Sequence, residues 1–187
     1  MKTRAHVRRA MIVLMACAIC VFVGCATSHP HKSQQEIDAG YYWYEGIFLD
    51  SEAVQAAFKG VSDGYPKYEV VPDLYHITTS YMQDAKHEDL YGTAVTVHIV
   101  GYANGTVRDE EEGVTSNNEG LLVELSTDNG DLQTLLDNTD RVWHITGSYT
   151  YAAMYTGRLD YSDMVPMDIT LEGTFGLADS EGKLTLG

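Results

Sequence analysis

One hexapeptide occurs twice in this chain, with five of its six positions identical, and this repeat constrains the fold more than any other feature. The copies are His-Ile-Thr-Thr-Ser-Tyr at 76–81 and His-Ile-Thr-Gly-Ser-Tyr at 144–149. Both copies are rich in β-branched and aromatic residues, which favours β-strands. A repeat of this kind predicts two similar structural units that pack together.

The residues before each copy predict the same order of elements. A strand over 41–49 is followed by a helix that begins after Asp50, and a strand over 120–126 is followed by a short helix after the turn at 128–131. The apolar residues at helical spacing are Val54, Ala57 and Phe58 in the first helix and Leu132, Leu135 and Leu136 in the second. Closing strands over 74–81 and 141–151 complete two strand–helix–strand units.

The rest of the chain predicts further antiparallel strands. A strand over 93–101 is followed by an acidic loop over 104–119, in which Asn104-Gly105 marks a turn. A hairpin over 167–177 and 183–186 ends the chain. We therefore expect an α+β fold with mostly antiparallel sheets and two helices, in two lobes related by an approximate two-fold axis.

The N-terminal segment has the pattern of a targeting signal. Residues 1–9 are basic, 10–24 are apolar, and Phe22-Val23-Gly24-Cys25 resembles the bacterial lipoprotein signal. The resemblance implies a signal peptide over 1–24, lipidation of Cys25, a polar tether over 25–39 and a domain over 40–187. It also implies an extracytoplasmic protein, anchored to the outer membrane if its source has two membranes. An uncleaved anchor or an ordinary secreted protein is the alternative.

Composition excludes several classes of function. All three cysteines, at positions 17, 20 and 25, lie in or beside the signal, so the domain has none for a disulfide, a thiolate metal site or a nucleophile. Four of the 12 basic residues precede Cys25, which leaves eight against 27 acidic residues. This balance argues against binding of long nucleic acids, which needs a surplus of Lys and Arg.

The repeated hexapeptide contains the candidate catalytic residues. Strand alternation places His76, Thr78 and Ser80 on one face, and the equivalent residues of the second copy follow the same pattern. If the units face each other, two imidazoles and two Thr hydroxyls meet in one cleft, with Ile77 and Ile145 buried behind them. One neutral His can accept a proton while the other, protonated, donates one, which suits cleavage of a phosphodiester without a metal or cofactor.

Two His-x-Thr motifs on strands of a duplicated α+β chain resemble the two-histidine phosphoesterases. The segments Trp143-His144-Ile145-Thr146 and 156–160 look most like the cyclic phosphodiesterase branch found in tRNA ligase. The resemblance implies that His76, Thr78, His144 and Thr146 are catalytic and that the substrate carries a 2′,3′-cyclic phosphate. The few basic residues favour a small nucleotide or RNA end over tRNA.

Other interpretations remain open at this point. The main alternative is a non-catalytic, lipid-anchored envelope binding module, and ligation or transesterification at RNA ends is a third possibility. We expect His98 to be structural and the acidic run 109–112 to be a solvated loop rather than a calcium site. The Tyr-rich stretches 41–44 and 149–155 are expected to pack in the core rather than to stack on a base.

Overall fold

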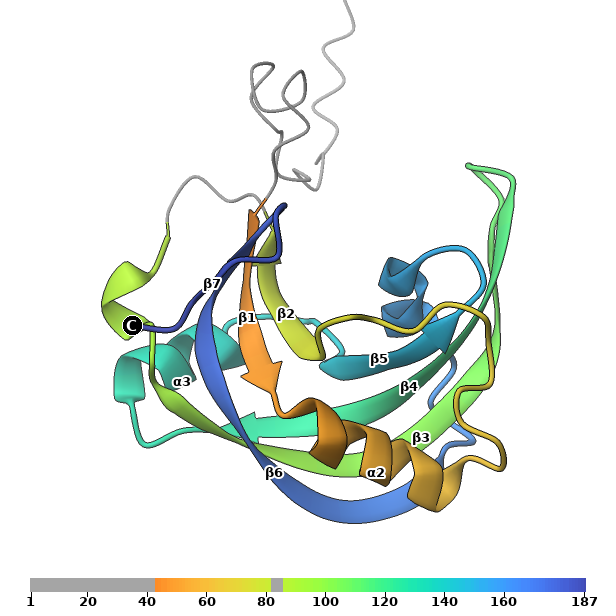
Figure 1. The fold of residues 1–187 in the computed structure, drawn as a ribbon, viewed down its shortest axis with the longest axis horizontal. Helices are drawn as coiled ribbons and strands as arrows, with labels where there is room; N and C mark the ends of the chain where they lie inside the picture. Colours follow the sequence, from red (N-terminus) through yellow and green to blue (C-terminus); the bar gives the residue numbers. More distant parts are fainter. Residues whose placement is uncertain (1–42, 82–85) are drawn as a thin grey trace, which may run out of the picture.

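A computed structural model describes residues 43–81 and 86–187 (Figure 1). The predicted signal peptide over 1–24, Cys25 and the tether over 25–39 lie outside the described residues. Within the described ranges, no helix has the length and apolar character needed to cross a membrane.

The described residues form an α+β domain with two α-helices, two 3₁₀ helices and one antiparallel sheet of seven strands. The strands are β1 (Trp43–Leu49), β2 (His76–Tyr81), β3 (Ala94–Asp109), β4 (Val114–Ser126), β5 (His144–Tyr149), β6 (Val165–Asp179) and β7 (Leu184–Thr185). The helices are α2 (Ser51–Val61), α3 (Gly130–Asp137), η1 (Glu88–Leu90) and η2 (Ala153–Arg158). The expected α+β class with mostly antiparallel strands is confirmed, as is the strand–helix–strand order of both units, and the strands form one sheet.

The sheet is strongly curved, and its two edge strands approach each other. The strand order is β2-β1-β6-β3-β4-β5, and β7 pairs with β6. Both copies of the repeated hexapeptide are therefore edge strands, and the curvature brings them to the same side of the molecule (Figure 1). Residues almost 70 positions apart in the sequence thus lie near each other.

Both α-helices contribute apolar side chains to one core. The Asp50 side chain caps α2 by accepting a hydrogen bond of 2.8 Å from the backbone N–H of Ala53. Phe58 of α2 and Leu132 of α3 are fully buried. Ile77 and Ile145 are buried in the same core, as predicted for the residues behind the two His-x-Thr motifs.

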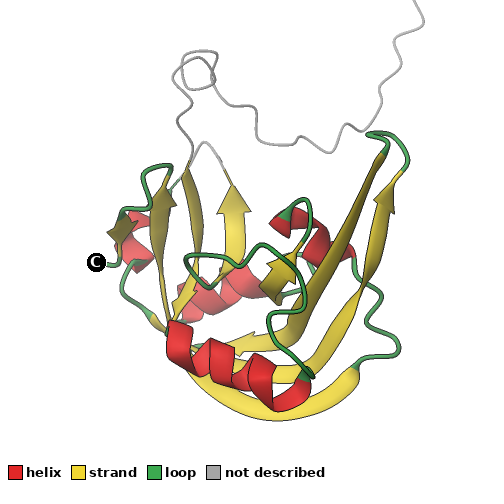
Figure 2. Ribbon diagram, turned by 45° about the vertical axis from the view of Figure 1, so that its right-hand side comes forward, coloured by secondary structure: helices red, strands yellow, loops and turns green. Residues whose placement is uncertain are grey.

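The region predicted as an acidic loop over 104–119 is a long hairpin, so that prediction is wrong. β3 continues to Asp109 and β4 begins at Val114, and together they extend beyond the rest of the sheet (Figure 2). The Asn104-Gly105 pair lies within β3 opposite 118–119 rather than in a turn. The hairpin is strand despite its polar sequence because its inner face packs Ala103 and Val107 against η2 and the residue that follows it.

The two units share the same strand pairing, including a β-bulge at the same place. In the first unit Glu45 pairs with Ser80 and Gly46 with Thr78, so Thr79 is the extra residue. In the second unit Glu119 pairs with Ser148 and Gly120 with Thr146, and the extra residue is Gly147. An extra residue interrupts the regular alternation of side chains along a strand.

Because of this bulge, the side chains of two serines point in the direction opposite to the one predicted. Ser80 and Ser148 do not share the face of the His and Thr side chains, as alternation alone predicted. Both serines are buried and bond to buried carboxylates, whereas Tyr81, one residue after Ser80, lies on the side of the motif's His and Thr. The bulge therefore leaves the His and Thr of each motif on the outer face of the sheet and turns the serine toward the core.

We predict that Gly46→Ala destabilises the domain by about 1–3 kcal/mol, because overpacking a close contact forces the backbone apart. A Cβ atom at Gly46 would lie 2.7 Å from the carbonyl oxygen of Ile77. Urea denaturation measures the change in the free energy of unfolding.

Gly60→Ala is the matched control, since a Cβ atom there meets nothing within 4 Å. This variant should stabilise helix α2 by about 0.5–1 kcal/mol. Equal stability of the two variants would contradict the tight packing of β1 against β2.

Candidate active site

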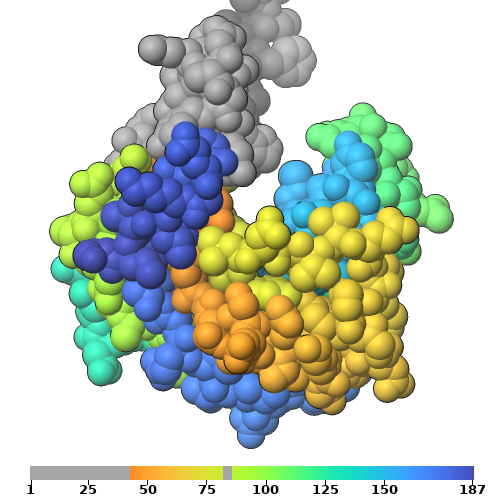
Figure 3. All heavy atoms as spheres, in the orientation of Figure 1, coloured from red at the N-terminus to blue at the C-terminus, as the bar shows by residue number. Residues whose placement is uncertain are grey.

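Both His-x-Thr motifs line one cavity. His76 and Thr78 from β2 face His144 and Thr146 from β5 across a cavity of about 830 Å³. The surface is hollowed between the yellow-green segment around β2 and the sky-blue segment that follows β5 (Figure 3). The structure thus brings together all four residues that the sequence singled out.

The two imidazoles are oriented by the same hydrogen bond. Nδ1 of His76 lies 3.0 Å from the carbonyl oxygen of Leu74, and Nδ1 of His144 lies 2.9 Å from that of Val142. A carbonyl oxygen can only accept, so Nδ1 of each neutral ring carries the proton. The lone pair is then on Nε2, which has no hydrogen-bond partner among the described residues and remains available to a molecule in the cavity.

Close packing fixes the position of both rings. The Tyr44 ring of β1 lies 4.5 Å from the His76 ring between centroids, and the ring of Phe48, which is opposite His76 on the same strand, lies 6.0 Å away. Next to the second ring, a Cβ atom at Gly157 of η2 would lie only 2.8 Å from Cε1 of His144. Glycine at 157 therefore gives the His144 ring its space.

Burial lowers the pKa of both imidazoles below the ordinary value of 6.5. The hydrogen bond to Leu74 opposes this effect at His76, and the charge of His144 lowers the pKa of His76 further. The carbonyl of Val142 likewise opposes the effect of burial at His144. The two rings are therefore close enough for protonation of one to disfavour protonation of the other.

The Thr hydroxyls are held loosely. Thr146 donates a long hydrogen bond of 3.4 Å to the carbonyl oxygen of Ala153. The Thr78 hydroxyl has no hydrogen-bond partner among the described residues. Both hydroxyls can therefore turn to donate to an oxygen atom of a molecule in the cavity.

Two guanidinium groups supply positive charge at the cavity. Arg158 is paired with Asp109, with 2.7 Å between Nη1 and Oδ2. Arg141 donates a hydrogen bond of 2.8 Å to the carbonyl oxygen of Thr79, the extra residue of the β2 bulge. Among the described residues no carboxylate forms an ion pair with Arg141, so its charge is the less compensated of the two.

The remaining cavity walls are largely apolar. They include Tyr44, Trp143 and Met154, together with Pro72 and Val142. These residues come from β1, from the segments before β2 and β5, and from η2. Arg141 and Met154 could not be singled out from the sequence, because neither belongs to a repeated motif.

The other residues considered in the sequence have local structural contacts. His98 is on the outer face of β3, where Nε2 lies 2.9 Å from Asp168. Asp109 caps the β3–β4 turn by accepting from the backbone N–H groups of residues 111 and 112 and pairs with Arg158. The described residues include no group of three or more acidic, His or Cys side chains arranged to hold a metal. Of the two Tyr-rich stretches, the described part contributes Tyr44 to the cavity, and Tyr155 is buried.

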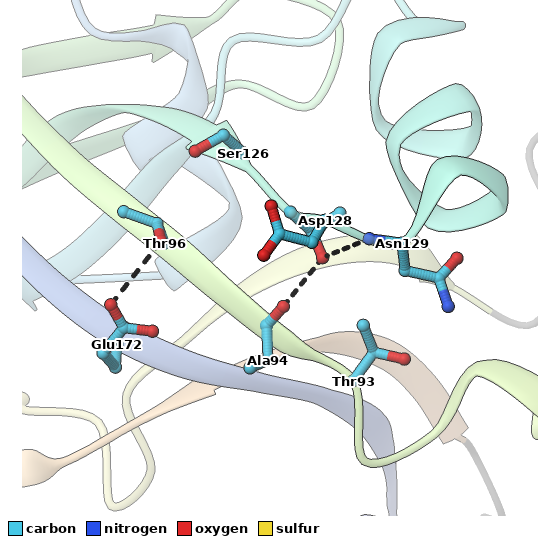
Figure 4. A pocket seen from close by; sticks show the side chains of 8 residues that line it. Thr93, Ala94, Thr96, Ser126, Asp128, Asn129 and Glu172 are labelled. Carbon is cyan, nitrogen blue, oxygen red and sulfur yellow. Dashed lines mark hydrogen bonds between the residues drawn. The ribbon is translucent and has the colours of Figure 1, made fainter.

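A second hollow of about 660 Å³ lies between β3, β6 and the start of α3 (Figure 4). Its side chains are occupied with local contacts: Thr96 donates a long hydrogen bond to Glu172, and Asn129 caps α3. None of its lining residues is a His, Cys, Lys or Arg. The first cavity is therefore the better candidate for acid–base chemistry.

Comparison with known proteins found no matching family model, curated protein or solved structure. The assignment of chemistry to this site consequently depends on its residues and their geometry.

We predict that His144→Gln raises the pKa of His76, because the variant removes a like charge that disfavours protonation of that ring. An NMR titration of the imidazole nitrogens measures this pKa directly.

His98→Gln is the control, since its ring lies outside the cavity, and it should leave the His76 titration unchanged. A His76 pKa that stays the same when His144 is replaced would show that the two rings are not coupled.

Proposed function

We propose that this protein is a metal-independent phosphodiesterase that opens a 2′,3′-cyclic phosphate on a small nucleotide or RNA end. The observation that carries the proposal is the matched orientation of the two imidazoles: each bonds through Nδ1 to its own backbone and presents Nε2 to one cavity. A single His in a cavity provides either an acid or a base. Two His residues oriented alike provide both at once.

The proposed reaction needs one ring in each protonation state. Nε2 of the neutral ring takes a proton from water as the water oxygen bonds to phosphorus. Nε2–H of the other, protonated ring donates its proton to the 2′ or 3′ oxygen as the P–O bond to that oxygen breaks. The negative phosphate favours protonation of one ring when it binds, which offsets the effect of burial on the pKa.

Donors around the cavity suit the charge that develops on the phosphoryl oxygens. The Thr78 and Thr146 hydroxyls can each donate a hydrogen bond to a non-bridging oxygen. The Arg141 guanidinium adds a positive charge and forms no ion pair among the described residues, although the Asp140 carboxylate lines the same cavity. One such charge suits a single phosphate rather than a long polyanion.

The apolar walls suit the organic part of a nucleotide. Tyr44 and Trp143 offer ring surfaces on which a base can stack, and base–aromatic stacking contributes about 1–3 kcal/mol. This part of the proposal makes Tyr44 both a support of the His76 ring and a wall of the substrate site.

The shared pairing of the two units supports a bilobal two-histidine phosphoesterase fold, in which each lobe contributes one motif. The pairs Glu45–Ser80 and Glu119–Ser148 occupy the same place in the two units, as do the bulges beside them. We further propose that Cys25 is lipidated and that the domain works outside the cytoplasm, anchored to a bacterial membrane.

We predict that His76→Ala and His144→Ala each reduce the hydrolysis of 2′,3′-cyclic nucleotides at least 10²-fold, because each removes one partner in proton transfer. Turnover by the purified domain is measured by separating the nucleotide products, which also distinguishes hydrolysis from ligation.

His98→Ala is the matched control and should retain the activity of the unchanged protein. Excess chelator should also leave turnover intact. Folded His76 and His144 variants that hydrolyse as fast as the unchanged protein would refute the proposal and favour a non-catalytic binding module.

We predict that kcat/KM against pH is bell-shaped with its maximum below pH 6.5. Both imidazoles have a pKa below 6.5, so raising the pH above that value depletes the protonated ring that must act as the acid. Initial rates at substrate concentrations well below KM measure this profile. A rate that continues to rise up to pH 8 would be incompatible with the paired-His mechanism.

A further inference from the structure

We infer that Glu45 and Glu119 are positioning residues: each holds, through one serine, the bulged strand that carries a His-x-Thr motif. This inference rests on the proposed function, because it assigns the two carboxylates a role in placing the catalytic imidazoles. Neither carboxylate lines the cavity, and both side chains are fully buried.

Each carboxylate accepts a hydrogen bond from the serine that follows the motif. Ser80 donates to Oε2 of Glu45 at 2.9 Å, and Ser148 donates to Oε1 of Glu119. In both units the serine pairs with the glutamate in strand register, directly beside the bulge. The side-chain bond therefore joins the two strands at the residue where their register shifts.

The other donors include a backbone N–H and a tyrosine hydroxyl at each site, but they come from different parts of the fold. Glu45 accepts from the backbone N–H and Nδ1 of His87 at 2.6 and 2.9 Å and from the Tyr91 hydroxyl at 2.8 Å. Burial alone would raise the pKa of Glu45, but these hydrogen bonds and that of Ser80 hold it below the ordinary value of 4.5. The carboxylate is therefore ionised at neutral pH.

Around Glu119 the donors come from other elements. They are the backbone N–H of Lys67 at 2.9 Å and the hydroxyls of Tyr102 and Ser62 at 3.0 and 3.3 Å. Of the residues at these two sites, the glutamate, the glycine after it and the serine of the motif occupy equivalent positions in the two units. A role common to both must therefore concern the motif strand rather than the surrounding loops.

Register explains why this bond matters for catalysis. A one-residue slip turns every side chain of a strand to its opposite face. For β2 such a slip would place His76 and Thr78 in the core and Ile77 in the cavity. An edge strand lacks a full strand partner on its open side, where β5 has only the bridge between Tyr149 and Val70, so the Glu–Ser bond adds a restraint on register.

The test compares hydroxyl deletions at the same carboxylate. Ser80→Ala removes a donor from the motif strand, and Tyr91→Phe removes a donor to Glu45 from outside it. Ser148→Ala and Ser62→Ala form the corresponding pair at Glu119. Each variant of a pair removes one hydroxyl donor from the same glutamate. Both variants of the pair therefore lose one hydrogen bond to that carboxylate.

We expect Ser80→Ala to shift the NMR signals of the His76 imidazole and Ser148→Ala to shift those of His144. Each should lower kcat about tenfold or more with a smaller change in KM, because small displacements of a catalytic group have large effects on rate. Ser80→Thr and Ser148→Thr keep a hydroxyl at these positions and should retain kcat. The Tyr91 and Ser62 variants should lower the melting temperature without these changes.

If the serine variants lower the melting temperature as the control variants do and leave the imidazole signals and kcat unchanged, the two pairs only stabilise the fold and the inference is wrong. Absence of hydrolysis by the unchanged protein would instead refute the proposed function. The imidazole signals would still decide whether the serines position the rings.

Discussion

The register of the two edge strands is the constraint on which the rest of this structure depends. β2 and β5 are each paired with one other strand of the sheet, β5 has one further bridge from Tyr149 to Val70, and each shifts register by one residue beside a buried glutamate. That shift leaves the His and Thr side chains facing the cavity while the following serine faces the core. Because the sheet curves, two strands at opposite ends of the strand order then form the walls of one cavity.

The chemistry that we propose depends on hydrogen bonds that are the same at both imidazoles and on neighbouring side chains that differ. Both rings bond to a backbone carbonyl two residues earlier, which leaves the same nitrogen of each ring available. Their wider surroundings differ: Tyr44 packs against His76, and Gly157 leaves space beside His144. Such differences can separate two chemically identical groups into an acid and a base.

The fold class and the four motif residues could be predicted from the sequence because they leave local signals. Periodicity indicated the helices, and the repeated hexapeptide indicated two strands at equivalent places in two units. The long β3–β4 hairpin was missed because its polar, turn-forming residues resemble a loop, and its strand character depends on packing against η2 and the residues that follow it.

The bulges and the buried glutamates could not be predicted with the same ease. Alternation within the hexapeptide placed Ser80 beside Thr78, and only the pairing partner shows that Thr79 is an extra residue. The Glu-Gly pairs at 45–46 and 119–120 were a usable signal, since each begins an apolar run that leads into a capped helix. The same dipeptide occurs elsewhere in the chain, so the alignment of the two units is needed to identify it.

The central claim is that two imidazoles act on one phosphorus atom, and titration with a nucleoside 2′-monophosphate, followed through the nitrogen signals of both rings, tests it most directly. We predict that the Nε2 signals of His76 and His144 shift together, with one dissociation constant. A shift of only one of the two Nε2 signals, or shifts of both with different midpoints, would contradict the claim.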